Sequence, residues 1–389
     1  MSHSFQHYLF EPIDSWFFRE ARSMDSSGAN TLSSLFPPPT KTLLGAIRHH
    51  IGEKYNADKG KTWKDLETGE LRKIIGYGED YEGSSFQAQG SWLFYNDQLY
   101  FPAPACLVKK ADNQGYGFFQ LKQDEKEKIL ASDMGNKNFV RCDAGDKPLE
   151  NYWLSRTGWE QVLRGMLPAE AELLTKEDIL IGEPRLGIGL ENKSTQKGML
   201  YTTEHIRLKD KDNKDIKVYL GVDIGEGNKN YLPDPQLIRF GGEARMAEMK
   251  KYKNDGQRFS LPEITLSDES NCDNNEVILV VYLLTPMPVA NLEKVINNAQ
   301  TQIMIDGIQS DIETAIIGKV QRFGGWDMVN HKPSPLRSYL PAGSCWYIRC
   351  NPTTAKELLK KQGAYLTRGN EKVQGYGQIL IGLNPTISK

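Results

Sequence analysis

Short apolar runs separated by glycine- and proline-rich stretches dominate the chain, a pattern typical of a mixed α+β protein. Residues 5–14 are aromatic-rich and contain Pro12, which suits an opening strand. Residues 86–105 hold two aromatic segments around Asn96 and Asp97, which predicts a hairpin. The longest apolar run, 277–289, contains two prolines and is shorter than the roughly 20 residues that cross a bilayer. It is therefore predicted to be a buried strand.

A helix is predicted over residues 41–55, because apolar side chains recur there on one face. These apolar side chains are Leu43, Leu44, Ile47 and Ile51, and the other faces carry Lys41, Arg48 and His49. Further helices are predicted near 158–163, over 291–304 and over 353–363, and strands over 343–350 and 376–384. After residue 276 this order is compatible with a βαββαβ ferredoxin-like unit, although the pattern does not fix which strands pair.

The length of 389 residues predicts two or three domains. The polar stretch 253–275 is the best boundary, which divides the chain into domains 1–252 and 253–389. Polar insertions are expected within the first domain, at about 109–150 and 209–235, and residues 209–217 resemble the charged tip of a hairpin.

Charge and motif content exclude several classes of protein. The net charge of -2 provides no global field for nucleic acid, so any such binding must use a local basic groove. The five cysteines include no CxxC pair, which indicates reduced thiols and no zinc site. The sequence contains no GxxxxGK[ST], GxGxxG or HExxH motif, so neither a metal nor a cofactor is expected. No secretory signal is visible at the N-terminus, so we expect a cytoplasmic protein.

Four segments place glycines next to strand-like runs, at 186–190, 240–245, 323–327 and 375–382. Glycine lets backbone amides approach a phosphate closely, and nearby cations can neutralise it. Each segment alone is more simply a bulge or a tight turn, but the four together favour a binding role. The candidate residues in and beside them are Arg185, Arg245, Gly375 and Gly377.

The segment 319–337 interleaves cations with rings, as the binding of single-stranded nucleic acid requires. Its candidate residues are Lys319, Arg322 and Trp326. The alternative interpretation is a solvated loop whose tryptophan packs into the core. A second basic set, Arg19, Arg22, Lys41 and Arg48, lies on the first connection and helix and has the same two interpretations.

His49 and His50 lie late in the predicted helix, away from its apolar face. A histidine beside Arg48 could act as the general base of a metal-independent RNA cleavage. A solvated or phosphate-contacting histidine is the simpler interpretation, and His49 is kept as a candidate RNA contact.

These motifs together resemble the RAMP superfamily of CRISPR proteins, and within it the third-subunit family of the type III-B Cmr effector. The resemblance rests on FEPIDSWFFREAR, SSLFPPPTKTLLGAIR, LYFPAPA, EPRLGIGLENKSTQKGMLY, FGGEARMA, VYLLTPMPV, GKVQRFGGWDM, PLRSYLPAGS and GYGQILIG, which occur in the order of that family. One departure is Ala21, which stands where the first connection of the family usually has glycine.

The resemblance implies an α+β protein with two ferredoxin-like (RRM-like) domains, polar insertions and glycine-rich loops. It implies a non-catalytic subunit that holds the 5′ handle of the crRNA and contacts the large polymerase-like subunit and the backbone RAMP subunits, in antiviral defence. The alternatives are an endoribonuclease that processes precursor crRNA with His49 or His50, and the equivalent handle-binding subunit of a type III-A complex.

Overall fold

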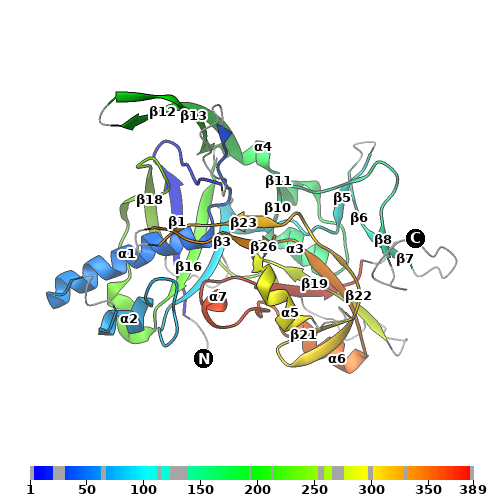
Figure 1. Cartoon of the computed structure of the whole chain (residues 1–389). Helices are drawn as coiled ribbons and strands as arrows, with labels where there is room; N and C mark the ends of the chain where they lie inside the picture. The colour runs from blue at the N-terminus through cyan, green and yellow to red at the C-terminus, as the bar shows by residue number, and fades with distance from the viewer. Residues whose placement is uncertain are drawn as a thin grey trace.

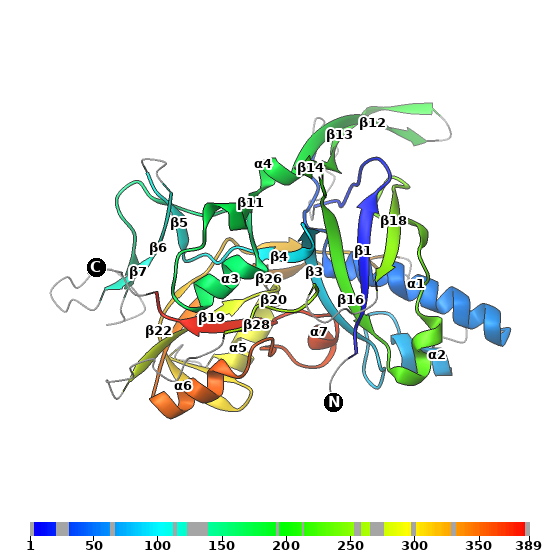
Figure 2. The ribbon, with the colours of Figure 1, turned by 180° about the vertical axis from the view of Figure 1, so that it is seen from behind.

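The computed structural model describes residues 4–20, 31–62, 67–111, 115–122, 139–191, 194–211, 214–252, 258–264, 276–296, 301–327 and 332–385. In these residues helices and antiparallel sheets alternate along the chain, so the fold is α+β, as predicted. Two large sheets lie side by side in the body, and a long hairpin projects from it (Figures 1 and 2). None of the helices in these ranges is long and apolar enough to cross a membrane.

The larger sheet has eight strands, and all its neighbouring strands are antiparallel. In spatial order they are β11 (Leu173–Thr175), β10 (Tyr152–Ser155), β4 (Gln98–Pro102), β3 (Gln87–Tyr95), β16 (Lys217–Asp223), β1 (Gln6–Pro12), β18 (Met246–Tyr252) and β17 (Gln236–Arg239). The predicted hairpin is confirmed as β3 and β4, with positive φ at both Asn96 and Asp97.

Helix α1 (Thr40–Lys59) packs on this sheet and confirms the helix predicted over 41–55. It buries the four apolar side chains that the spacing placed on one face, because this face covers the sheet. The smaller helices on this half are α2 (Glu70–Ile75), the 3-10 turn η3 (Glu226–Tyr231), and, at the far edge, η2 (Glu170–Glu172) and α4 (Lys176–Ile179).

The second sheet has five antiparallel strands, in the order β21 (Gln302–Ile305), β22 (Ile308–Ile316), β27 (Cys345–Cys350), β19 (Val277–Leu283) and β28 (Ile379–Leu383). Helix α6 (Pro352–Leu359) covers it together with α5 (Leu292–Val295), which follows η4 (Val289–Asn291). The predicted strands 277–289, 343–350 and 376–384 are thereby confirmed over Val277–Leu283, Cys345–Cys350 and Ile379–Leu383, and the helix predicted over 353–363 is confirmed up to Leu359.

The helix predicted over 291–304 is confirmed only over Leu292–Val295 and is wrong at 301–304, while residues 297–300 lie outside the described residues. Residues 302–305 form strand β21, which turns at Asp306 and Gly307 into β22. Both turn residues have positive φ, and Asp-Gly between alternating apolar residues is a strong hairpin signal. Ile303 and Ile305 are buried while Met304 is exposed, the alternation expected of a strand with one buried face.

The two sheets share one core. Trp92, Phe101 and Tyr219 of the first sheet lie in the same buried cluster as Tyr282 and Tyr347 of the second. Helix α3 (Arg156–Leu163), which confirms the helix predicted near 158–163, contributes Trp159 to this cluster. A backbone hydrogen bond of 2.8 Å from Ala105 N to Gly343 O also crosses between the halves. The division into domains at residue 253 stays a prediction.

The projecting hairpin, called the arm here, consists of β12 (Leu180–Glu191) and β13 (Ser194–Leu208). Its register shifts between Ile188 and Leu190, in the glycine-rich stretch, and β2 (Thr31–Leu32) pairs in parallel with β13 at the base. Strands β14 (Asp210–Lys211) and β15 (Lys214–Asp215) form the hairpin predicted at 209–217.

The insertion predicted at 109–150 forms two small sheets in its described parts. One contains β5 (Leu107–Lys109), β6 (Tyr116–Phe118) and β9 (Lys147–Pro148), and the other β7 (Gln120–Lys122) and β8 (Phe139–Arg141). Most of its charged run lies outside the described residues.

Candidate nucleic-acid interface

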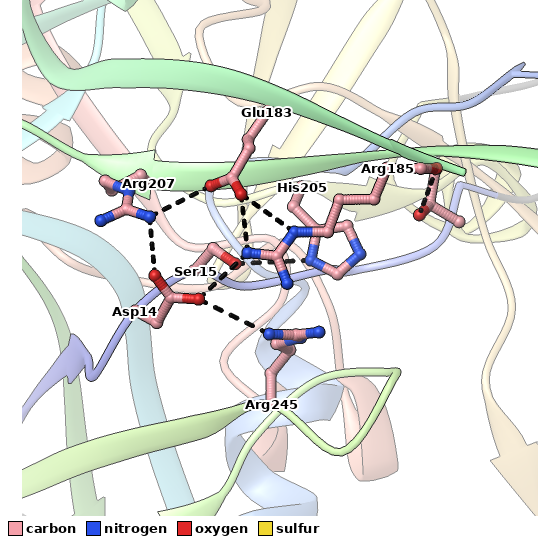
Figure 3. A network of polar contacts seen from close by, with 8 residues as sticks. Asp14, Ser15, Glu183, Arg185, His205, Arg207 and Arg245 are labelled. Atoms are coloured by element: carbon pink, nitrogen blue, oxygen red, sulfur yellow. Dashed lines mark hydrogen bonds and ion pairs between the residues drawn. The ribbon is translucent and has the colours of Figure 1, made fainter. Parts of the chain in front are cut away.

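Three arginines from distant parts of the chain gather around Asp14, which follows β1 (Figure 3). The Oδ1 of Asp14 lies 2.6 Å from Arg207 Nη2, and its Oδ2 lies 3.0 Å from Arg185 Nη2 and 3.6 Å from Arg245 Nη1. Glu183 also accepts from Arg185 at 2.7 Å and from Arg207 at 3.2 Å. These five side chains are called the arginine cluster.

The register of the arm explains how this cluster forms. Glu183 pairs with His205 and Arg185 with Thr203, so the odd-numbered residues share the face that lies against the end of β1. On this face His205 is buried and stacks on Phe17, with ring centroids 5.2 Å apart. Its pKa is lowered by burial and then by the nearby arginines, so the ring is neutral at pH 7.

Arg245 reaches the arginine cluster from the loop between β17 and β18. Phe240 N donates to Arg245 O at 2.8 Å, and Gly242 N donates to Phe17 O at 2.8 Å. Gly241 has φ +95°, and a Cβ there would lie 2.8 Å from Phe17 O. This glycine segment is therefore a tight turn that carries a cation, and its backbone donor at Gly242 is already used.

The arginine cluster carries a net positive charge. The pKa of Asp14 is lowered chiefly by its hydrogen bond with Arg185, and hydrogen bonds with Arg185 and Arg207 lower that of Glu183. Both acids are ionised at pH 7, yet the cations outnumber them. Between 25% and 46% of each arginine side chain is exposed, so the guanidinium groups can still bind an anion.

The lowered pKa of Asp14 predicts a pH-dependent contribution to stability. A carboxylate with a depressed folded-state pKa stabilises above its ordinary value, 3.8, and this contribution is lost as pH falls through the folded value. We expect Asp14→Asn to lower the melting temperature at pH 7 and to differ less from the wild type at pH 2 than at pH 7. Equal differences at the two pH values in thermal melts would contradict this expectation.

A second cluster lies where the two halves meet. Lys41, in the first turn of α1, pairs with Glu79 and donates to Ser334 Oγ at 3.2 Å. Arg337, on β26 (Arg337–Leu340), lies 3.3 Å from Glu79. This pocket, called the lysine pocket, is lined by Lys41, Glu79, Phe323, Gly324, Pro335, Arg337, Tyr339, Glu371, Gln374 and Tyr376. Its lining residues come from α1 and from two of the four glycine segments, 323–327 and 375–382, among others.

The C-terminal glycine segment holds α1 in place. Gly375 has φ +81° and a Cβ there would lie 3.0 Å from Ala88 O, while Gly377 has φ +73° and faces Thr367. Between them the Tyr376 hydroxyl accepts a hydrogen bond from the backbone N–H of Lys41. Gly375 and Gly377 are both buried, so in this structure they position Tyr376 rather than face solvent.

The other candidates on the first connection and α1 lie apart from these contacts. Arg48 donates to Gly78 O at 2.8 Å and to Tyr81 Oη at 3.0 Å, with its guanidinium carbon 4.7 Å from the centroid of the Tyr81 ring. Arg48 therefore anchors the turn that carries Glu79. Arg19 is exposed beside β2, and His49 is exposed on α1 with its ring 5.4 Å from that of His50.

Lys319 and Arg322 are both exposed, and neither belongs to the arginine cluster or lines the lysine pocket. Strand β23 comprises Gln321–Phe323, and Lys319 lies exposed two residues before it. Phe323 pairs with Arg337 and its ring lies 4.8 Å from that of Tyr339, so these residues face the lysine pocket. Arg322 therefore lies on the opposite face. Trp326 begins β24 (Trp326–Asp327), which pairs with β25 (Lys332–Pro333), and its side chain lies outside what the structure describes.

Sequence reasoning missed Arg207, Glu79 and Ser334 as site residues and did not commit to Arg337. Arg207 could have been found only from the arm register, which opposes it to Ile181. Nothing in the sequence around Glu79 distinguishes it from other surface acids. Over the described ranges, no group of three or more His, Cys, Asp or Glu residues is placed to hold a metal ion.

The fold has solved counterparts. A chain of the "Type III-B Cmr-beta bound to cognate target RNA and AMPPnP, state 1" matches with TM-score 0.50 and 13% identity, covering 98% of this chain and 100% of that one. A chain of the "Type III-B Cmr-beta bound to cognate target RNA" matches with TM-score 0.48 and 13% identity, covering 96% of each. At this identity the first likeness shows the fold alone. No curated protein sequence matches the chain.

The family comparison is more specific. A family model described as "CRISPR-associated protein (Cas_Cmr3)" matches residues 8–384. The molecule is therefore a CRISPR-associated protein, and the resemblance to the RAMP superfamily is confirmed. Within that class, the chain belongs to the Cmr3 family.

Proposed function

We propose that this chain is a non-catalytic subunit of a type III-B CRISPR effector complex that holds the 5′ handle of the crRNA. In this role it bridges the large polymerase-like subunit to the backbone RAMP subunits in the cytoplasm. Membership of the Cmr3 family supports the proposal, as does the likeness in fold to a chain of a Cmr complex bound to cognate target RNA.

One observation carries the RNA-binding part of the proposal, namely the arginine cluster. It brings Arg185 and Arg207 of the arm together with Arg245 of the β17–β18 loop around Asp14, at a surface beside the base of the arm. Guanidinium groups bind phosphates through forked hydrogen bonds, and the partly exposed state of these three leaves donors for that purpose. Lys41 and Arg337 in the lysine pocket would extend the phosphate path.

We also propose that each half of the chain is a ferredoxin-like unit, and the strand order supports this. In the first sheet β3, β16, β1 and β18 are neighbours, and in the second β22, β27, β19 and β28 are neighbours. Numbered along the chain, each set has the spatial order 2-3-1-4. A helix follows the first strand (α1 or α5) and another the third (η3 or α6). Each half would thus be a βαββαβ unit with additions.

The proposal predicts weak binding by the isolated chain, because the net charge is near zero and a handle held between subunits meets only part of its surface here. We expect a Kd of about 10⁻⁶ M or weaker for single-stranded RNA at physiological salt, the range of non-specific binding. Adding the large subunit should tighten binding at least tenfold. Fluorescence anisotropy titrations with a labelled repeat RNA, with and without that subunit, measure both values.

The same titrations test the non-catalytic assignment. The probe should remain intact in EDTA over the whole titration. Cleavage that disappears in His49→Ala or His50→Ala would reject the non-catalytic assignment in favour of an endoribonuclease. Tight binding by the free chain, with no gain from the large subunit, would contradict a shared site.

A further inference from the structure

Glu79 occupies an unusual place in the lysine pocket. Its carboxylate contacts Lys41 from the first half of the chain and Arg337 from the second. Ser334, which is buried, places its hydroxyl 3.2 Å from the same lysine. Two cations and a hydroxyl group thus converge on one carboxylate, the set of donors that also suits a phosphate oxygen.

The turn that carries Glu79 is held independently of this contact. Tyr77 and Asp80 exchange backbone hydrogen bonds of 2.7 and 2.8 Å, and Arg48 binds Gly78 O. Asp80 also accepts from Arg72 at 2.9 Å. Because these bonds fix the turn, the Glu79 side chain can leave the cations without unfolding the backbone that presents it.

The three charged side chains remain partly open to solvent. The exposed fractions are 29% for Lys41, 38% for Glu79 and 52% for Arg337. Pairs at this exposure are typically worth about 0.2–1 kcal/mol, so an incoming anion can compete with the carboxylate. Burial alone would raise the pKa of Glu79, but Lys41, Ser334 and Arg337 together lower it, so the competing group is charged at pH 7.

We propose that Glu79 is a built-in occupant of a phosphate site, and that a phosphodiester group of single-stranded RNA displaces it from Lys41 and Arg337. This inference rests on the proposed RNA-binding function and adds the regulation of one of its contacts. Glu79 lowers the affinity for any RNA that does not also engage the rest of the surface, because each binding event must first free the two cations. Glu79 thereby increases the difference in affinity between an RNA that contacts the whole interface and one that contacts only part of it.

The first test compares Glu79→Gln with a matched control, Asp234→Asn. Asp234 also lies between two lysines, 3.9 Å from Lys54 Nζ and 3.6 Å from Lys251 Nζ, but outside the pocket. In anisotropy titrations of the full chain with a fluorescein-labelled 20-nucleotide RNA, we expect Glu79→Gln to bind about 5- to 10-fold more tightly. The slope of log K against log salt should change little, because Lys41 and Arg337 contact the phosphate in both proteins once the RNA is bound. Asp234→Asn should change neither quantity.

The second test uses the wild-type chain, so it does not depend on the folding of a variant. A water-soluble carbodiimide should join the paired Lys41 amine and Glu79 carboxylate through an amide, which peptide mass spectrometry detects. Saturating amounts of the same RNA should suppress this cross-link, while the cross-link between Lys361 and Asp306, paired at 2.6 Å on the second half, should persist.

The outcomes separate this inference from the proposed function. If RNA binds and Arg185→Ala weakens it, but Glu79→Gln binds no more tightly or the Lys41–Glu79 cross-link survives saturation, the inference is overturned and the RNA-binding function stands. A fall in melting temperature of Glu79→Gln with weaker RNA binding would show that Glu79 joins the two halves structurally, and would also overturn it. If the wild type binds no RNA even with the large subunit, both fail.

Discussion

Replacing Arg185 and Arg245 together by alanine should weaken binding of single-stranded RNA about 100-fold at low salt. Each hydrogen-bonded contact to a charged group is worth about 1.5–3 kcal/mol, or at least tenfold in affinity. Loss of both arginines also leaves Asp14 and Glu183 with Arg207 as their remaining partner in the cluster, which adds repulsion of the phosphates. Titrations at several salt concentrations should show the log K against log salt slope reduced in magnitude by about 1.4.

The control for this prediction is Arg349→Ala. Arg349 on β27 is likewise held by two carboxylates, Glu276 at 2.5 Å and Glu313 at 2.6 Å, but it lies on the second sheet away from the arm. Its replacement should leave the affinity and the slope unchanged. An equal loss in the control and in the double variant would mean that the arginine cluster is not the RNA contact.

Gly343→Ala should be among the most destabilising single substitutions in the chain. Gly343 has φ +89°, and an added Cβ would lie 2.4 Å from Ala103 O. That oxygen belongs to the other half, so relief requires the two halves to separate where Ala105 N donates to Gly343 O. We expect a loss of about 3 kcal/mol or more, from the left-handed backbone and the clash together.

The matched control is Gly307→Ala. Gly307 has nearly the same φ, +87°, but an added Cβ meets no heavy atom within 4 Å. It should therefore show the backbone strain alone, about 1–2 kcal/mol. The difference between the two melting temperatures measures the clash at the junction of the halves. Similar melting temperatures for both variants would mean that the junction adapts to the extra methyl group.

Elements whose sequence signals lie within a few neighbouring residues were predicted correctly. Helix α1 follows from apolar residues spaced along one face, and the β3–β4 hairpin from Asn96 and Asp97, which tolerate positive φ. Strand β21 was missed although Asp306-Gly307 is a signal of the same kind. There the whole run 291–304 was predicted to be one helix, and the Asp306-Gly307 turn that ends β21 was not taken into account.

The site was harder to predict because it depends on contacts between distant segments. Arg185 and Arg245 were chosen for neighbouring glycines, yet their meeting at Asp14 depends on the arm register and on the turn at Gly241. Arg322 was chosen for its charge, and the pairing of β23 with β26 turns it away from the lysine pocket. The glycine segments were interpreted as places of close approach; in the structure those at Gly241 and Gly375 approach the chain itself.

The shared core between the two sheets limits how this chain can be divided. Trp92, Phe101 and Tyr219 on one side and Tyr282 and Tyr347 on the other bury the same apolar surface. A fragment ending near residue 252 would expose its half of that surface to water, and such large apolar patches promote aggregation. The polar stretch 253–275 is therefore a poor place to cut the protein for separate expression, even though its composition resembles a linker. Studies of either half are better made in the full chain, by substitutions confined to one sheet.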